Sequence, residues 1–261
     1  MEKVKKNNSN FVNSNGHIIP KPFGTDYELE PGKVYTLTHD RDLYIDYLVE
    51  DKDFDFPKTY YLNDKDHNFI NKTIDTFNKT EKMTTGVLLS GMKGSGKTLM
   101  AKKIAKMSGL PIIVVDSKMN SDDIEPFFAK ITDDVCVIFD EIDKYWSTRY
   151  LLTFLDGVKP TCKKMVICTC NDEKEINTYL NDRCSRIRYK KRFGGLSKDT
   201  VEGIINDIVG DKNKANAAAE YICSNVQTIS YDNIIIFGEE LKNNPDDSFD
   251  EIIEFLNIDK K

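Results

Sequence analysis

Histidine and tryptophan are scarce in this chain. Among its 261 residues there is one tryptophan, and the three histidines, His17, His39 and His67, all lie in the first 67 positions. We therefore expect no histidine base, and no zinc site, in a functional site built from later residues. Acid–base chemistry in that part of the chain would have to come from carboxylates and amides.

Cysteine is present, but not in a pattern that binds metal. The six cysteines include no C-x-x-C pair, and four of them lie in or beside apolar, strand-like runs. We expect buried, reduced thiols, which favours a cytoplasmic location. The six are Cys136, Cys162, Cys168, Cys170, Cys184 and Cys223.

Long hydrophobic runs are also missing. No apolar stretch approaches the roughly 20 residues that span a bilayer. The polar start of the chain, residues 1–15, lacks the hydrophobic segment of a signal peptide. The sequence therefore predicts a protein without a membrane partner.

Positive charge is limited and unevenly distributed. The net charge of −6 argues against nonspecific nucleic-acid binding as the main source of affinity. Only six arginines occur among 37 basic residues, and four of them fall within ten positions: Arg183, Arg186, Arg188 and Arg192. Because arginine binds carboxylate or phosphate through a planar, bidentate group, this cluster is a candidate recognition element.

The strongest motif runs from Gly91 to Thr98, which match every fixed position of the phosphate-binding loop G-x-x-x-x-G-K-[ST]. Its glycines let backbone N–H groups point at phosphate oxygens, Lys97 would reach the β- and γ-phosphates, and Thr98 would offer its hydroxyl to Mg²⁺. The alternative is a glycine-rich turn without a ligand, which the strand-like run before the loop and the helical pattern after it disfavour. The expected nucleotide contacts are Gly91, Lys93, Gly94, Ser95, Gly96, Lys97, Thr98 and Leu99.

Strand-like and helical patterns alternate around this loop. The strand-like runs are residues 85–90, 111–116, 135–140 and 164–170, and the helical ones are 99–107, 121–131 with Ser121 as its cap, and 147–156. This alternation predicts an α/β fold with a doubly wound parallel sheet. The later patterns are helical only, at residues 198–208, 214–224, 231–241 and 248–256. They predict a small C-terminal helical lid domain.

Four regions follow from these patterns. We expect a disordered tail at residues 1–15, an N-terminal arm or small domain at 16–84, an α/β core at 85–193 and the lid at 194–261. The second region has strand-like pieces at 34–37 and 59–62 and a helical pattern at 64–78. An arm is preferred, because about 60 residues of mixed pattern give a marginal core.

An apolar strand that ends in two acids is the second strong signal. Asp140, at the end of the run 135–140, would orient Mg²⁺ directly or through its water. Glu141, one residue further, would accept a proton from an attacking water. A strand followed by Asp-Glu can also be a plain surface turn. The preceding phosphate loop favours the catalytic interpretation.

Three segments together resemble the AAA ATPases, ring-forming members of the AAA+ superfamily of P-loop NTPases. They are DEID at residues 140–143, LLTFLDGV at 151–158 and the strand 165–171 that ends in Asn171. The resemblance covers about residues 80–195. It implies ATP and Mg²⁺ as ligands, self-association into a ring, expected to be a hexamer, and hydrolysis coupled to remodelling of a macromolecular partner.

The resemblance also implies roles for single residues. Asn171 would be the sensor that places the lytic water, although a strand-ending turn is the alternative. Arg183 and Arg186 lie where these ATPases send arginines across the subunit boundary, so they are candidate arginine fingers. Cys184 and Ser185 stand where Pro-Gly is common, which leaves open which arginine reaches further. Surface salt bridges or a nucleic-acid contact are the alternatives for the arginines.

Ser230 to Asp232 offer no second arginine sensor, which agrees with the narrower AAA group. One departure from the family leaves the substrate open: residues 116–121 lack the aromatic of a pore loop, although Lys118 and Met119 could still face a pore. A nucleotide-gated scaffold with little turnover therefore remains an alternative function. So does a DNA-acting helicase loader, with Arg188, Lys190, Lys191 and Arg192 as contacts.

Overall fold

The computed structural model describes residues 11–14, 16–20, 27–42, 44–56, 64–81, 84–156, 161–174, 176 and 187–261. The expected strand at 59–62 and the two candidate arginine fingers, Arg183 and Arg186, lie outside the described residues. The chain divides into two compact units. The first comprises residues 1–54, 69–90 and 98–191, and the second comprises residues 55–68, 91–97 and 192–261.

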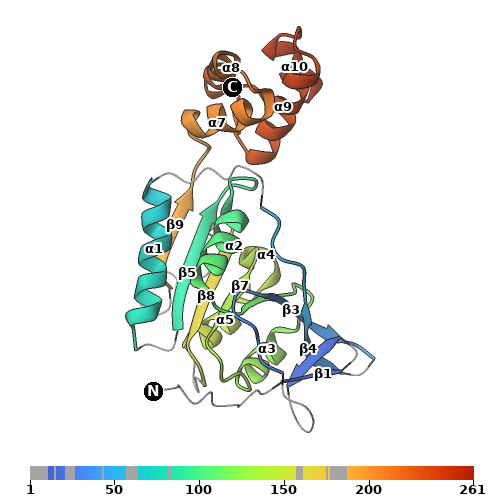
Figure 1. Cartoon of the computed structure of the whole chain (residues 1–261), viewed down its shortest axis with the longest axis vertical. Coiled ribbons are helices and arrows are strands. Elements are labelled where there is room, and N and C mark those ends of the chain that lie inside the picture. The colour runs from blue at the N-terminus through green and yellow to red at the C-terminus, as the bar shows by residue number, and fades with distance from the viewer. Residues whose placement is uncertain are drawn as a thin grey trace, which may run out of the picture. The chain divides into compact units, whose positions relative to one another are not determined.

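The described strands form a nine-stranded sheet in the order β1-β2-β4-β3-β6-β7-β8-β5-β9 (Figure 1). The first four pair antiparallel: β1 (Phe11–Ser14), β2 (His17–Pro20), β4 (Ile45–Glu50) and β3 (Val34–Asp40). The next pairings are parallel and run from β3 through β6 (Ile112–Val115), β7 (Val135–Phe139), β8 (Lys164–Cys170) and β5 (Thr84–Gly91). β9 (Ile187–Phe193) follows β5 in the order.

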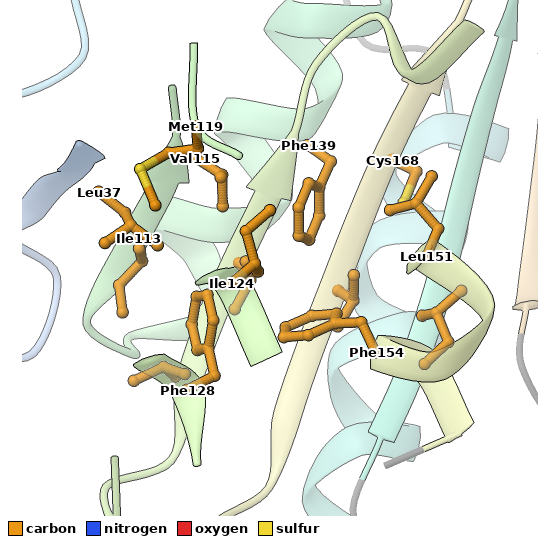
Figure 2. Close-up of a cluster of buried hydrophobic side chains, with 14 of the residues drawn as sticks. Leu37, Ile113, Val115, Met119, Ile124, Phe128, Phe139, Leu151, Phe154 and Cys168 are labelled. Atoms are coloured by element: carbon orange, nitrogen blue, oxygen red, sulfur yellow. The ribbon is translucent and has the colours of Figure 1, made fainter. Parts of the chain in front are cut away.

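Helices cover both faces of the parallel strands. On one face, Phe128 of α3 (Ser121–Phe128) and Phe154 of α5 (Thr148–Asp156) pack in a cluster with Val137 and other strand residues (Figure 2). The neighbouring Cys136 and Ile167 are equally buried but lie outside that cluster, because successive strand residues point to opposite faces. Buried residues of α1 (Asp64–Lys79) and α2 (Lys97–Ser108) also lie outside it. The predicted doubly wound α/β fold is confirmed.

Several local predictions need correction. Asn120, not Ser121, caps α3: its side chain accepts a hydrogen bond from the backbone N–H of Asp122, and the helix ends at Phe128. Helix α4 (Ile142–Tyr145) and the basic strand β9 have no counterpart among the predicted elements. Strand β1 begins within the segment expected to be a disordered tail.

The five cysteines among the described residues behave as the sequence indicates. Cys136, Cys162, Cys168 and Cys170 are buried and lie in no disulfide, and Cys223 is half-buried. Burial raises the pKa of the Cys168 thiol to about 12 and raises that of Cys136 as well, so both stay protonated at neutral pH.

The second unit contains the four predicted C-terminal helices: α7 (Lys198–Val209), α8 (Lys212–Asn225), α9 (Tyr231–Asn243) and α10 (Phe249–Phe255). Each begins after a residue whose side-chain oxygen accepts backbone N–H bonds: Ser197, Asp211, Ser230 and Ser248. The helices share their own buried cluster. Within the described part of the chain, every helix is too short or too polar to span a membrane.

Candidate functional site

One predicted metal ligand and one predicted catalytic residue leave the sheet at the same edge. Strands β7 and β8 are parallel, with Phe139 beside Cys168. The residues that follow these strands, Asp140 and Asn171, therefore emerge at the carboxyl edge, where open α/β sheets bind their ligands.

Thr169 joins the two acids that follow β7. Its hydroxyl donates a hydrogen bond to Asp140 Oδ1 and accepts one from the backbone N–H of Glu141 at 2.9 Å. Thr169 is fully buried in a strand that is otherwise mainly apolar. The sequence reasoning missed this residue. The available signal was a hydroxyl in a buried run, since such a group requires a partner.

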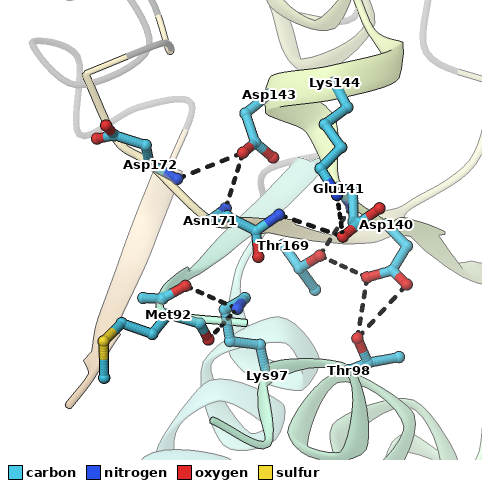
Figure 3. Close-up of polar contacts among 11 residues, drawn as sticks. Met92, Lys97, Thr98, Asp140, Glu141, Asp143, Lys144, Thr169, Asn171 and Asp172 are labelled. Atoms are coloured by element: carbon cyan, nitrogen blue, oxygen red, sulfur yellow. Dashed lines mark hydrogen bonds and ion pairs between the residues drawn. The ribbon is translucent and has the colours of Figure 1, made fainter. Parts of the chain in front are cut away.

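Glu141 is held by backbone and side-chain contacts. Its φ of 48° places it in the left-handed region, which is uncommon for a residue with a side chain. Its carboxylate Oε1 accepts hydrogen bonds from Asn171 Nδ2 at 3.2 Å and from Lys144 Nζ at 2.7 Å (Figure 3). The bond to Glu141 raises the pKa of Lys144. The predicted base and the predicted sensor are thus in contact.

Asp143 fixes the tip of β8. Its Oδ2 accepts hydrogen bonds from the backbone N–H groups of Asn171 at 3.0 Å and Asp172 at 3.3 Å. This carboxylate therefore anchors the backbone that carries the Asn171 amide. Asp143 thus helps to position Asn171, the predicted sensor, a contact that the sequence reasoning did not assign.

Thr98 and Asp140 provide oxygen ligands suited to Mg²⁺. Thr98 Oγ1 lies 3.1 Å and 3.4 Å from the two carboxylate oxygens of Asp140. A hydroxyl and a carboxylate in contact are the hard donors that Mg²⁺ takes together with phosphate oxygens. The residues present therefore fit this cation. We call Thr98, Asp140, Glu141, Thr169 and Asn171 the carboxylate cluster.

The phosphate loop, residues 91–97, belongs to the second unit. Gly91, Gly94 and Gly96 all have positive φ, which only glycine adopts readily. Lys97 is 5% exposed, and its ammonium donates hydrogen bonds to the carbonyls of Gly91 and Met92, both at 2.7 Å. These dihedral angles and hydrogen bonds hold the backbone of the loop in a tightly turned conformation.

Other loop positions differ in exposure. Ser95 is buried, and its hydroxyl has no hydrogen-bond partner in the structure, which suits a ligand oxygen there. The side chain of Lys93 is exposed, and Leu99 is half-buried on α2.

The start of α9 packs on this loop within the second unit. The backbone N–H of Tyr231 donates to the Gly94 carbonyl at 2.8 Å. A Cβ added to Gly94 would lie 2.8 Å from Ser230 Cβ, and one added to Gly96 would lie 3.0 Å from the Tyr231 ring. Tyr231 therefore packs on the loop at the place where the sequence offered no arginine. The sequence reasoning assigned Tyr231 no contact with the loop.

The basic residues of β9 have varied environments. Lys191 lies over the Phe69 ring, 5.8 Å from its centroid, and Tyr189 packs edge-on against the same ring. Arg188 and Lys190 have exposed side chains. Part of the candidate nucleic-acid surface is therefore engaged in packing against α1.

The fold and the site define a P-loop nucleotide-binding protein, and the comparisons specify its kind. Residues 87–192 match the family described as ATPase family associated with various cellular activities (AAA). Over these residues the chain is similar to the AAA ATPases, as the sequence resemblance indicated. A search of curated proteins found no match.

Among solved structures, the chain is similar to a proline-to-glycine mutant of RuvB from Thermotoga maritima. The two share 17% sequence identity at a TM-score of 0.54, and the match covers 74% of this chain and 71% of that one. A likeness at this identity concerns the fold alone, and it agrees with the AAA+ architecture.

Proposed function

We propose that this protein is an Mg²⁺-dependent ATP hydrolase of the AAA type that works as a ring and remodels a macromolecular partner. The observation that carries the hydrolase assignment is the carboxylate cluster. In this cluster Glu141, the proposed base, contacts the Asn171 amide, and Thr169 joins Glu141 to Asp140, which contacts Thr98. These contacts support the proposal that Asn171 orients the water and that Asp140 and Thr98 hold Mg²⁺.

Each side chain has a distinct part in this proposal. Glu141 accepts a proton from the attacking water, and the Asn171 amide orients that water. Thr98 and Asp140 would hold Mg²⁺, which neutralises charge on the phosphates when bound. Lys97 and the N–H groups of the loop bind the phosphate oxygens. The choice of ATP over GTP follows from the family alone.

Phosphate release by purified protein tests the hydrolase assignment. We expect wild-type turnover to require Mg²⁺ and to fall about 10²-fold or more in Glu141→Gln, because the base is removed while the shape is kept. Glu81→Gln, at an exposed position, is the matched control and should keep wild-type turnover. Equal rates in wild type and Glu141→Gln would disprove the role of Glu141 as base.

The ring and the arginine fingers rest on the family resemblance and on the position of Arg183 and Arg186 in the sequence. Mixing two inactive variants, Arg186→Ala and Lys97→Ala, tests them. Where the two kinds of subunit meet, the Arg186→Ala subunit supplies an intact phosphate loop. The Lys97→Ala subunit supplies an intact Arg186, so the two together can form one complete site. Recovery of turnover is expected on mixing, whereas a mixture as inactive as its components would remove Arg186 as a finger.

One observation favours a second candidate, a nucleotide-gated scaffold with little turnover. The Glu141 carboxylate forms an ion pair with the Lys144 ammonium at 2.7 Å. To act as a base, Glu141 would have to break this ion pair and form a hydrogen bond with the attacking water. The scaffold predicts ATP-dependent assembly without phosphate release. Measuring particle mass and phosphate release in the same samples separates the two functions.

A further inference from the structure

Three side chains with metal-binding atoms converge outside the nucleotide site. His39 on β3 lies opposite Asp46 on β4, with His39 Nδ1 2.9 Å from Asp46 Oδ1. Asp123, in the first turn of α3, completes the group. One ring nitrogen and one oxygen from each carboxylate lie within 4.8 Å of one another, and all three residues are half-buried.

The fold of the first unit brings these residues together from distant parts of the sequence. Strand β3 runs parallel to β6, with Leu37 beside Val115, and the N–H of Asp116 donates to the Leu37 carbonyl at 3.0 Å. The chain then turns and enters α3 after its Asn120 cap. The first turn of this helix thereby meets the carboxyl end of β3, which carries His39.

We propose that His39, Asp46 and Asp123 form a binding site for a divalent transition-metal ion of the Zn²⁺ class. Zn²⁺ binds imidazole nitrogen and carboxylate oxygen at about 2.0–2.2 Å, so the ligand atoms of a tetrahedral site lie roughly 3.3 Å apart. The His39–Asp46 pair is already near that separation. Small rotations of Asp123 bring its oxygen to the same distance, and water takes the fourth position.

The chemistry of the three ligands selects the class of ion. Two carboxylates neutralise the charge of a divalent cation, which lowers the cost of holding it in a half-buried place. The imidazole favours Zn²⁺, Co²⁺ or Ni²⁺ over Mg²⁺ and Ca²⁺, which take oxygen ligands. The site therefore discriminates against the cation expected at Thr98 and Asp140.

The competing interpretation is a set of ordinary polar contacts. A cross-strand histidine–aspartate hydrogen bond stabilises a hairpin, and an aspartate in the first turn of a helix interacts favourably with the helix dipole. That interpretation explains each contact singly and needs no metal. It predicts the same protein stability with and without Zn²⁺.

A bound ion would link three elements of the first unit. It would join the β3–β4 hairpin to α3 and so restrain residues 116–120, which connect β6 to that helix. These residues fall within the segment 116–121, which lacks the aromatic of a pore loop. The proposed ion is thus structural, and it is separate from the ATPase assignment because none of its ligands belongs to the carboxylate cluster or the phosphate loop.

Binding to the full chain, stripped of metal and kept in excess Mg²⁺, tests the site. Calorimetry with Zn²⁺ and the visible absorption of Co²⁺ serve as two independent readouts. We expect wild type to bind one ion and to gain thermal stability. His39→Gln and Asp123→Asn should each weaken binding at least tenfold. His67→Gln, an exposed histidine on α1, is the matched control and should bind as wild type does.

Two results would overturn the proposal: no saturable binding by wild type, or binding by both His39→Gln and Asp123→Asn with wild-type affinity. The second result would place any ion elsewhere, for example on a cysteine. Circular dichroism establishes that each variant is folded. If His39→Gln disturbs the sheet, Asp123→Asn decides the matter, since it changes one atom in the first turn of a helix.

Discussion

The carboxylate cluster and the phosphate loop hold their shapes in different ways. In the cluster, hydrogen bonds between side chains of separate strands set the geometry, with Thr169 bonded to both acids. In the loop, three glycines at positive φ and one lysine bonded to two carbonyls set it. The first depends on side-chain atoms, whereas the second depends mainly on the backbone.

This difference indicates how each region responds to substitution. A side-chain change in the cluster should remove chemistry while the fold and nucleotide binding persist. A change in the loop should remove binding itself, and a change of backbone conformation there should also disturb the packing of α9. The predictions below test this contrast.

Lys97→Ala has the largest expected effect. It removes an ammonium that binds two loop carbonyls, and hydrogen bonds of a charged group contribute about 1.5–3 kcal/mol each. We expect ATP affinity to fall about 100-fold or more, measured by titration with a fluorescent ATP analogue. Lys79→Ala, at the exposed end of α1, is the control. Unchanged affinity in Lys97→Ala would show that the loop does not bind the phosphates.

Thr169→Val should impair the cluster without abolishing binding. It leaves the N–H of Glu141 and the Asp140 carboxylate without their shared partner, which costs about 1–3 kcal/mol in the free energy of unfolding. We expect turnover to fall about tenfold, because a loss of about 1–2 kcal/mol in transition-state stabilisation lowers the rate roughly 5- to 30-fold. Thr169→Ser restores the hydroxyl and should restore most of the turnover. Equal turnover in the valine and serine variants would contradict the role of this hydroxyl.

Gly94→Ala and Gly109→Ala compare two similar backbone strains. Their φ values are 73° and 68°, so alanine costs about 1–2 kcal/mol at either position. Only at Gly94 would the new Cβ also lie 2.8 Å from Ser230, while nothing lies within 4 Å at Gly109. We expect a larger loss of thermal stability and weaker ATP binding in Gly94→Ala. Equal losses of thermal stability in the two variants would mean that the contact between Gly94 and the start of α9 does not contribute to stability.

A smaller effect, on the pH dependence of stability, is expected from Tyr231 in the second unit. Burial, with a contribution from the charge of Asp66, raises the pKa of Tyr231 to about 12. The unfolded phenol titrates near pH 10. The folded state therefore holds this proton more tightly, and its contribution to stability is complete below pH 10 and is lost as the pH rises toward 12. In Tyr231→Phe, the melting temperature should fall less between about pH 10 and pH 12 than it does in wild type. An equal fall in both proteins would show that other groups cause the alkaline loss of stability.

The sequence predicted the elements whose signals are contiguous. The phosphate loop, the strand that precedes Asp140 and the four C-terminal helices each carry their pattern within a few residues. Parallel strands that end at one edge then bring Asp140 and Asn171 together, so that part of the cluster could be foreseen. The role of Arg183 and Arg186 stays a prediction.

The parts that the sequence did not predict depend on contacts between distant segments. In the sequence, Thr169 is one residue of a mainly apolar strand. Its partners, Asp140 and Glu141, become apparent only when β7 pairs with β8. Tyr231 meets Gly94 only through the packing of the second unit, and His39 meets Asp123 only through the pairing of β3 with β6. A local pattern can show that the buried Thr169 hydroxyl needs a partner, but it does not show which distant residue supplies that partner.

Single-turnover hydrolysis of bound ATP by Glu141→Gln tests the central claim most directly. The account predicts that this variant binds ATP and Mg²⁺ within about threefold of wild-type affinity, and cleaves the bound ATP about 10²-fold more slowly or not at all. Cleavage at the wild-type rate would contradict it, because the carboxylate cluster would then not be the place where hydrolysis occurs.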